Sequence, residues 1–233
     1  MFLNGALGDV TQVDNRSPNK PPTGEQWAQL VGGRVGAEAL KVTLGLERGD
    51  FRPIDFRSQI LRIKRRAPAP ERVKQCLELV HQSPAKVGAT EWTFAKEIVL
   101  LDAKLRKEAV VEVEVQAIQV GPAVFVTTPA EYFCQLGLDI KARCPLPFTF
   151  PVSLANGCVG YVPTEDAFGP NGGGYETRLT SYSNLEISAG RQMADAGVVL
   201  TKQFKPGTVP VAAKHLPFTG KPWSYGDVRP DLK

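Results

Sequence analysis

The sequence lacks any apolar run that approaches the roughly 18–20 residues needed to cross a bilayer. Its opening residues contain no basic region and reach Asp9 too early for a secretory signal peptide. As written, the chain is therefore expected to be cytoplasmic, with no transmembrane segment. Wholesale disorder is also excluded, because 42% of the residues are hydrophobic and only 22% are charged.

Histidine is scarce, and cysteine does not follow the spacing of a metal site. The two histidines are His81, near a predicted helix end, and His215, in a proline-rich tail, and we expect both to have ordinary surface or packing roles. The cysteines form no Cys-x-x-Cys pair, so we interpret them as buried thiols. They are Cys76, Cys134, Cys144 and Cys158. A P-loop is excluded, since no Gly-Lys-Ser/Thr follows the glycine run 172–174.

Positive charge is concentrated in one segment. The formal net charge is +4, from 28 basic and 24 acidic residues. Seven basic residues and one acidic residue lie between Arg57 and Lys74, and the remaining 21 basic and 23 acidic residues leave the rest of the chain slightly negative. Aromatic residues are not interleaved with this patch, so no nucleic-acid partner is expected. The patch is interpreted in one of two ways: as a solvent-exposed strand edge whose charges prevent pairing with another strand, or as an anion-binding surface.

Hydrophobic periodicity predicts a mixed α/β fold, with a β-sheet core and helices packed on its outer faces. Strict alternation of valine with polar residues makes 111–117 the clearest strand. Helices are expected over 24–45, 70–82, 90–105, 131–143 and 187–203, and extended segments over 51–66, 111–117, 123–128 and 148–154. We assign residues 1–203 to one domain. The tail 204–233, which contains five prolines, is expected to have little regular structure.

The predicted helix over 24–45 has a distinctive composition. Thr23 and Gln26 have the spacing of a capping box at its start. Several of its residues have small side chains, which lower helix propensity and indicate close packing against a neighbouring element. They are Gly32, Gly33, Gly36 and Ala37.

Three side chains stand where predicted strands give way to turns or loops. Glu131 follows Pro129-Ala130, at the kind of strand end where α/β folds place ligands. An alternative is a first-turn glutamate that interacts with a helix dipole. Tyr161 and Tyr175 lie in or beside a glycine-rich loop, where a tyrosine is either a packed ring or a ligand-binding group.

Four segments, taken in order, carry a family resemblance. They are Phe2–Thr11, Pro129-Ala130-Glu131, Ala155–Phe168 and Gly174-Tyr175-Glu176. Together they resemble the later half of the catalytic domain of neutral/alkaline (non-lysosomal) ceramidases, and most nearly the bacterial ceramidase-like branch. The resemblance covers about residues 1–203.

This resemblance implies a zinc-dependent amidohydrolase that cleaves the amide of an N-acyl sphingoid or related lipid. Matched by motif, Glu131 and Tyr161 are the implied zinc ligands, and Tyr175 supports the oxyanion. Thr11 stands where the family has its nucleophilic serine, and Asp9 would position that hydroxyl group. In such chemistry zinc polarises the carbonyl and lowers the pKa of a nucleophile, while a phenol stabilises the developing charge.

The sequence departs from the family pattern in several ways. Threonine at position 11 adds a β-methyl group that crowds nucleophilic attack. Alanine replaces the glycine of Pro-Gly-Glu, and the separation between Tyr161 and Tyr175 is slightly longer than usual. The family's zinc-binding histidines precede the Gly8-Asp9 motif, so the resemblance implies about half an active site here, completed by a missing N-terminal half or by a homodimer partner.

Three functional interpretations follow. The first is the ceramidase-like hydrolase, in a partial or inactive form; that family is often secreted or membrane-associated. The second is a non-catalytic relative that keeps the fold and serves as a structural domain or binds a lipid-like or glycan ligand, which Thr11 and the missing histidines favour. The third is an anion-binding module that uses the segment between Arg57 and Lys74.

Overall fold

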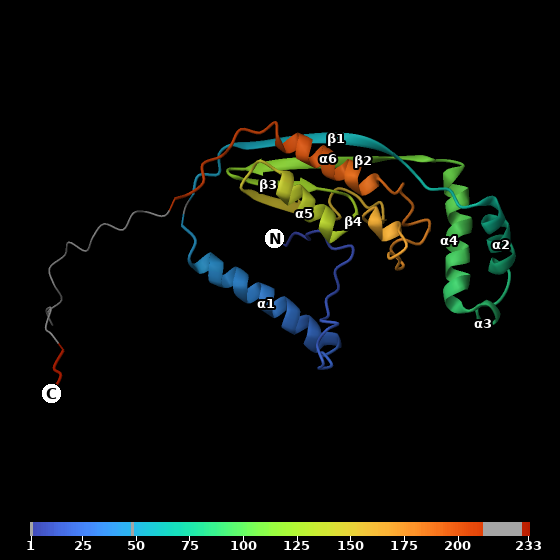
Figure 1. The fold of residues 1–233 in the computed structure, drawn as a ribbon, viewed down its shortest axis with the longest axis horizontal. Helices are drawn as coiled ribbons and strands as arrows, with labels where there is room; N and C mark the ends of the chain where they lie inside the picture. Colours follow the sequence, from blue (N-terminus) through green and yellow to red (C-terminus); the bar gives the residue numbers. More distant parts are fainter. Residues whose placement is uncertain (1, 48, 212–229) are drawn as a thin grey trace.

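The computed structural model describes residues 2–47, 49–211 and 230–233, and its centre is a four-stranded sheet in the order β1-β2-β3-β5. The strands are β1 (Ile54–Lys64), β2 (Val110–Val120), β3 (Ala123–Thr127) and β5 (Phe148–Val152). The first three are antiparallel neighbours, and β5 runs parallel to β3. The predicted mixed α/β fold is thus confirmed (Figure 1).

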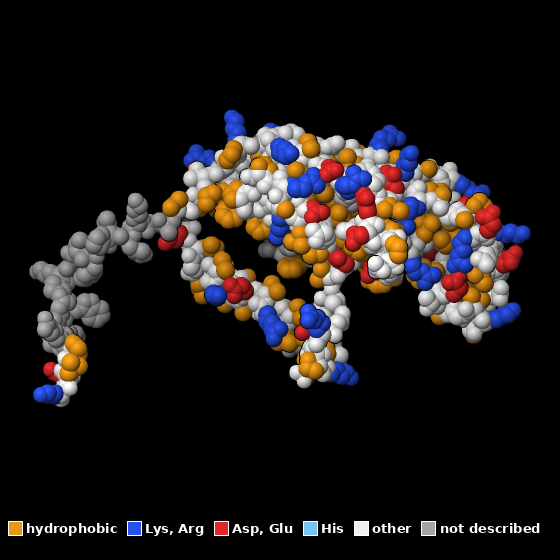
Figure 2. Space-filling model, viewed as in Figure 1, with side chains coloured by type: hydrophobic (Ala, Val, Ile, Leu, Met, Phe, Trp, Pro, Cys, Tyr) orange, Lys and Arg blue, Asp and Glu red, His pale blue; other side chains and the backbone are white. Residues whose placement is uncertain are grey.

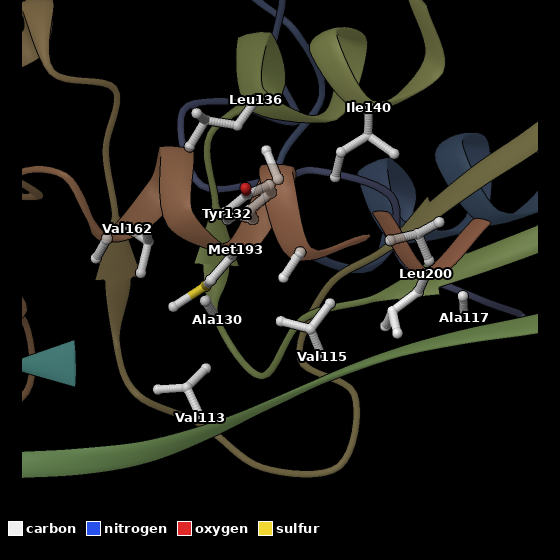
Figure 3. Close-up of a cluster of buried hydrophobic side chains, with 14 of the residues drawn as sticks. Val113, Val115, Ala117, Ala130, Tyr132, Leu136, Ile140, Val162, Met193 and Leu200 are labelled. Carbon is white, nitrogen blue, oxygen red and sulfur yellow. The ribbon is translucent and has the colours of Figure 1, made fainter. Parts of the chain in front are cut away.

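One face of this sheet carries the main hydrophobic core. Strand β2 alternates as predicted, and its inward residues meet helix α6 (Ala189–Thr201) and helix α5 (Cys134–Arg143) in one cluster (Figure 3). Gly197 lets α6 approach the sheet closely, because a Cβ atom there would lie 2.6 Å from Cγ1 of Val126. The buried side chains in this cluster include Val113, Val115, Val126, Met193 and Leu200.

A smaller helical unit stands at one end of the sheet. Helices α2 (Pro70–Val80), α3 (Pro84–Val87) and α4 (Ala89–Leu105) follow β1, and Cys76, Ala95 and Ile98 form their buried centre. The prediction of buried thiols holds for Cys76, whereas Cys134 and Cys144 are only half-buried. It is wrong for Cys158, which is exposed because it lies on a loop outside both cores. His81, at the end of α2, is exposed as expected.

Helix α1 (Gly24–Leu44) has the predicted bounds but not the predicted packing. None of its residues is buried by the described part of the chain, and apart from the adjacent residues and the backbone of α1 itself no described atom lies within 4 Å of a Cβ built on Gly32, Gly33 or Gly36. Thr23 makes no side-chain capping bond to the described residues. Figure 1 shows α1 set apart from the sheet. The neighbour that its small residues indicated is therefore not supplied by the chain's own described elements.

Two further expectations concern membranes and the tail. No helix among the described residues has both the length and the apolar character to span a membrane. Within the tail, 205–211 and 230–233 form no helix or strand, which agrees with the expectation for those residues. Residues 212–229, with His215, lie outside the described residues. The domain boundary at 203 stays a prediction.

Candidate functional site

A separate two-stranded parallel sheet brings two of the predicted site residues together. Strand β4 (Glu131–Tyr132) pairs with β6 (Tyr161–Val162) so that Glu131 lies directly opposite Tyr161. Glu131 donates its backbone N–H to the carbonyl of Gly160 at 3.0 Å. The prediction that a helix begins at Glu131 is therefore wrong, because this N–H enters a strand ladder and α5 begins only at Cys134.

The side chains of this small sheet alternate between core and surface. Tyr132 and Val162 point into the main core, where the Tyr132 hydroxyl donates to the Gly190 carbonyl at 2.5 Å. Because neighbouring residues on a strand face opposite sides, the Glu131 side chain points away from that core. Glu131 and Tyr161 both stay partly accessible, although Tyr161 also packs against the edge of the core. The buried Tyr132 thus fixes the direction in which the Glu131 carboxylate points.

Around Glu131 the structure assembles a cluster of phenols. The Tyr182 hydroxyl donates to Oε1 of Glu131 at 2.7 Å, and the Tyr161 and Tyr175 hydroxyls are 3.3 Å apart. The ring of Tyr161 stands edge-on to that of Tyr175, with centroids 5.4 Å apart, and edge-on to that of Tyr182 at 6.1 Å. The sulfur of Cys158 lies 3.1 Å from the Tyr182 hydroxyl. Three predicted residues therefore share one site with two that the sequence analysis did not identify.

Tyr182 and Cys158 were missed because each is placed by tertiary contacts. The segment that carries Tyr182 is held beside β6 by the Ser183 hydroxyl, which accepts the Tyr161 N–H at 3.1 Å. Gly160 permits this approach: its φ is +82°, and a Cβ there would lie 2.1 Å from the Tyr182 carbonyl oxygen. A glycine directly before a predicted site tyrosine was the one available signal, and it did not say which segment would approach.

The Gly8-Asp9 loop is bound to the same strand and helix. Gly8 donates its N–H to the Tyr132 carbonyl at 2.8 Å, and Oδ1 of Asp9 accepts the N–H of Cys134 at 2.6 Å. Asp9 thereby satisfies a free N–H at the start of α5, as a capping carboxylate does. Thr11 is exposed, and its hydroxyl accepts the Val13 N–H at 3.4 Å. Among the hydrogen bonds of the described residues, none joins Asp9 to Thr11.

Desolvation controls the protonation of the two phenols nearest Glu131. Burial raises the pKa of Tyr161 above its ordinary value of about 10, and hydrogen bonds with Tyr175 and Glu131 raise it further. Burial also raises the pKa of Tyr182, with Cys158 and Glu131 adding to the shift. Burial in the core has the same effect on the pKa of Tyr132. Near neutral pH these phenols are therefore protonated, and Tyr182 presents a hydrogen-bond donor to the Glu131 carboxylate.

These shifts predict an incomplete tyrosine titration. Because three of the five tyrosines have raised pKa values, the near-ultraviolet tyrosinate absorbance of the folded chain at pH about 11 should stay well below that of the denaturant-unfolded chain. The pKa of these tyrosines is higher in the folded state than in the unfolded state. Their contribution to the free energy of unfolding is therefore fully present below pH about 10 and is lost as the pH rises further. Equal absorbance of the two states, with circular dichroism showing a folded protein, would contradict the predicted environment.

The described donor atoms only partly fit the implied zinc ion. The Glu131 carboxylate and the Tyr161 phenol are oxygen donors on paired strands, but zinc sites in proteins have three or four protein ligands. Among residues 2–47, 49–211 and 230–233, no group of three or more His, Cys, Asp or Glu side chains could hold a metal ion. The described part of the chain therefore provides a partial ligand set.

The basic segment between Arg57 and Lys74 is largely engaged within the chain. Arg57 pairs with Asp55, Arg65 with Glu108, and Arg72 with Glu91. The guanidinium of Arg66 donates to the Leu185 carbonyl at 2.9 Å, and burial lowers its pKa. Because these arginines already have partners, the geometry favours a structural role for the segment over an anion-binding role.

Known proteins provide a limited comparison. No protein-family model matches the chain, and no curated protein matches its sequence. Its fold is similar to that of neutral ceramidase from Pseudomonas aeruginosa, with a TM-score of 0.49 and 15% identity over 84% of this chain and 36% of that one. A ceramidase complexed with C2 has a TM-score of 0.47 and 13% identity, over 84% of this chain and 38% of that one. The chain thus spans little more than a third of either protein.

Proposed function

We propose that this chain carries part of the active site of a ceramidase-like, zinc-dependent amidohydrolase. Its substrate class would be the amide of an N-acyl sphingoid or a related lipid. The observation that carries the proposal is the register of β4 against β6, which sets Glu131 directly opposite Tyr161. These are the two motif-matched metal ligands, and they lie far apart in sequence. The third motif-matched residue, Tyr175, reaches the same cluster at 3.3 Å from the Tyr161 hydroxyl.

In this proposal Glu131 and Tyr161 hold the metal ion together with ligands from a second polypeptide segment, either an N-terminal half or a partner copy. Bound zinc would supply Lewis-acid polarisation of the amide carbonyl. Tyr182 orients the Glu131 carboxylate through its 2.7 Å hydrogen bond, as outer-shell groups orient metal ligands. Tyr175 is an exposed phenol that can donate a hydrogen bond to a developing oxyanion.

The proposal assigns the nucleophile to Thr11 and its positioning to the Gly8-Asp9 loop. That loop is hydrogen-bonded to Tyr132, the residue next to Glu131, and to the start of α5. Thr11 therefore lies only three residues along the chain from Gly8, which is hydrogen-bonded to the strand that carries Glu131. Because Asp9 caps α5, its contribution would be to hold the loop in place.

The competing candidate is a non-catalytic relative of the same fold. It is favoured by the Glu131 carboxylate, which already accepts a hydrogen bond from Tyr182, and by the partial ligand set. In this candidate the open cluster of phenols would bind a lipid-like or glycan ligand without breaking a bond.

The test combines zinc content with hydrolysis. Purified full chain is supplied with zinc, its metal content is measured by elemental analysis, and release of fatty acid from micellar N-acyl sphingosine is followed by mass spectrometry. Bound zinc without turnover is expected, because the ligand set is partial. Chelator-sensitive turnover would show a complete hydrolase and exclude the non-catalytic candidate. If the chain shows no bound zinc and no turnover, the hydrolase proposal is contradicted.

A further inference from the structure

The face of the central sheet opposite α6 carries an apolar patch that the described part of the chain leaves largely uncovered. Two neighbouring ladder rows cross all four strands on this side, and we call them the open face. Phe56 is 69% exposed, and Phe150, which stacks on Phe125 with ring centroids 5.3 Å apart, is 45% exposed. The rows are Phe56-Ile118-Phe125-Phe150 and Ile54-Val120-Ala123-Phe148. An exposed apolar patch that crosses all four strands of a sheet is typical of an interaction site.

Where the described chain does approach the open face, it covers only one margin. The N-terminal segment, with Leu3 and Ala6, and helix α5, with Leu138, approach Phe125 and Phe150 there, and a hollow of about 280 Å³ remains among them. The β1 side, with Phe56 and Ile54, stays exposed. In Figure 2, hydrophobic side chains line the side of the body that faces α1, and open space separates the two.

Helix α1 is a second apolar surface that the described residues do not cover. Its large aliphatic side chains spread over more than half of its circumference, and they include Leu30, Val31, Val35, Leu40 and Val42. An apolar stripe this wide is normally covered by another element in folded proteins, so α1 is expected to have a packing partner. Its four charged residues, Glu25, Arg34, Glu38 and Lys41, sum to zero, so two copies of α1 do not repel each other.

The geometry of the two surfaces is complementary. Helix α1 is about 31 Å long, which matches the roughly 36 Å of β1 and β2. The bulky rings on the open face are complementary in shape to the glycines of α1, which have free space around them. The open face is apolar at the start of β1 and charged further along, at Arg62 and Glu112. Helix α1 likewise has three of its four charges at or beyond its midpoint.

We propose that two copies of this chain associate by exchange, with α1 of each copy covering the open face of the other. A two-fold arrangement covers both surfaces on both copies, which is how closed homodimers form. A helix about 31 Å long and 10 Å across gives a total buried area on the order of 1,200 Å² for two such contacts, which reaches the size of specific interfaces.

The test uses sedimentation velocity on the full chain and on three variants. Phe56→Asp places a charge on the open face, and Val35→Asp places one on α1; both positions are at least half exposed, at 69% and 50%. The control is Leu100→Asp on α4, at 53% exposure and on neither surface. We expect the wild-type chain and the control to be dimers and both interface variants to be monomers, with unchanged circular dichroism.

Mixing the two interface variants distinguishes exchange from other dimers. The Phe56→Asp chain keeps an intact α1, and the Val35→Asp chain keeps an intact open face. The mixture should therefore form heterodimers, in which α1 of the first chain covers the open face of the second. A monomeric wild-type chain, as would result if α1 docked on its own sheet or if the face bound a different protein, would overturn the proposal. So would dimerisation that both variants retain, or a mixture that stays monomeric.

Discussion

Replacing Glu131 by glutamine is expected to weaken zinc binding by about 100-fold or more. Loss of an outer-shell partner alone costs about 10–100-fold in metal affinity, and this substitution removes the one carboxylate of the proposed ligand set. Glutamine keeps the size of the side chain and the backbone N–H that bonds to Gly160, so β4 should stay paired with β6. Competition with a chelating indicator at neutral pH measures the effect.

Two comparisons make the Glu131 result specific. Glu165→Gln removes an exposed carboxylate that pairs with Arg191 at 2.7 Å outside the phenol cluster, and should leave zinc affinity unchanged. Tyr182→Phe should weaken binding by about tenfold, because it removes only the hydroxyl that orients Glu131. Equal zinc affinity in the wild-type chain and the Glu131→Gln variant would show that Glu131 is not a zinc ligand.

Substituting alanine for Gly160 is expected to destabilise the protein by about 3 kcal/mol or more and to open the phenol cluster. Two penalties combine at this position. Its φ of +82° disfavours any side chain, and the added Cβ would lie 2.1 Å from the Tyr182 carbonyl oxygen, a backbone atom that cannot rotate away. Relief of the clash has to move Tyr182 away from β6. The free energy of unfolding from denaturant titration measures the loss.

Gly173→Ala is the matched control for Gly160. Gly173 also has a positive φ, of +134°, but no described atom lies within 4 Å of a Cβ built there. It therefore isolates the conformational penalty from the steric clash. If the two substitutions cost the same free energy of unfolding, the close approach of the Tyr182 segment to β6 is incorrect. If the clash operates, only Gly160→Ala should also lower the alkaline pH at which Tyr182 ionises.

The site shows why local patterns predicted its residues but not its construction. Glu131, Tyr161 and Tyr175 were identified from short motifs, and the structure groups them. The helix predicted to begin at Glu131 was wrong because residues 131–143 carry a helical pattern that gives no sign of the pairing with Tyr161. Tyr182 has no motif at all, and only the contact of its segment with Gly160 places its hydroxyl on the carboxylate.

By itself the sequence determined the mixed α/β class and the positions of its main helices and strands, because alternation along β2 and helical spacing along α4 and α6 are local properties. Tertiary structure alone decided which residues meet at the site and which surfaces stay uncovered. Strand register joins segments about thirty residues apart, as at Glu131 and Tyr161, and burial depends on what else the chain brings near. For that reason the small residues of α1 indicated a packing neighbour, and only the folded chain showed that its own described elements do not supply one.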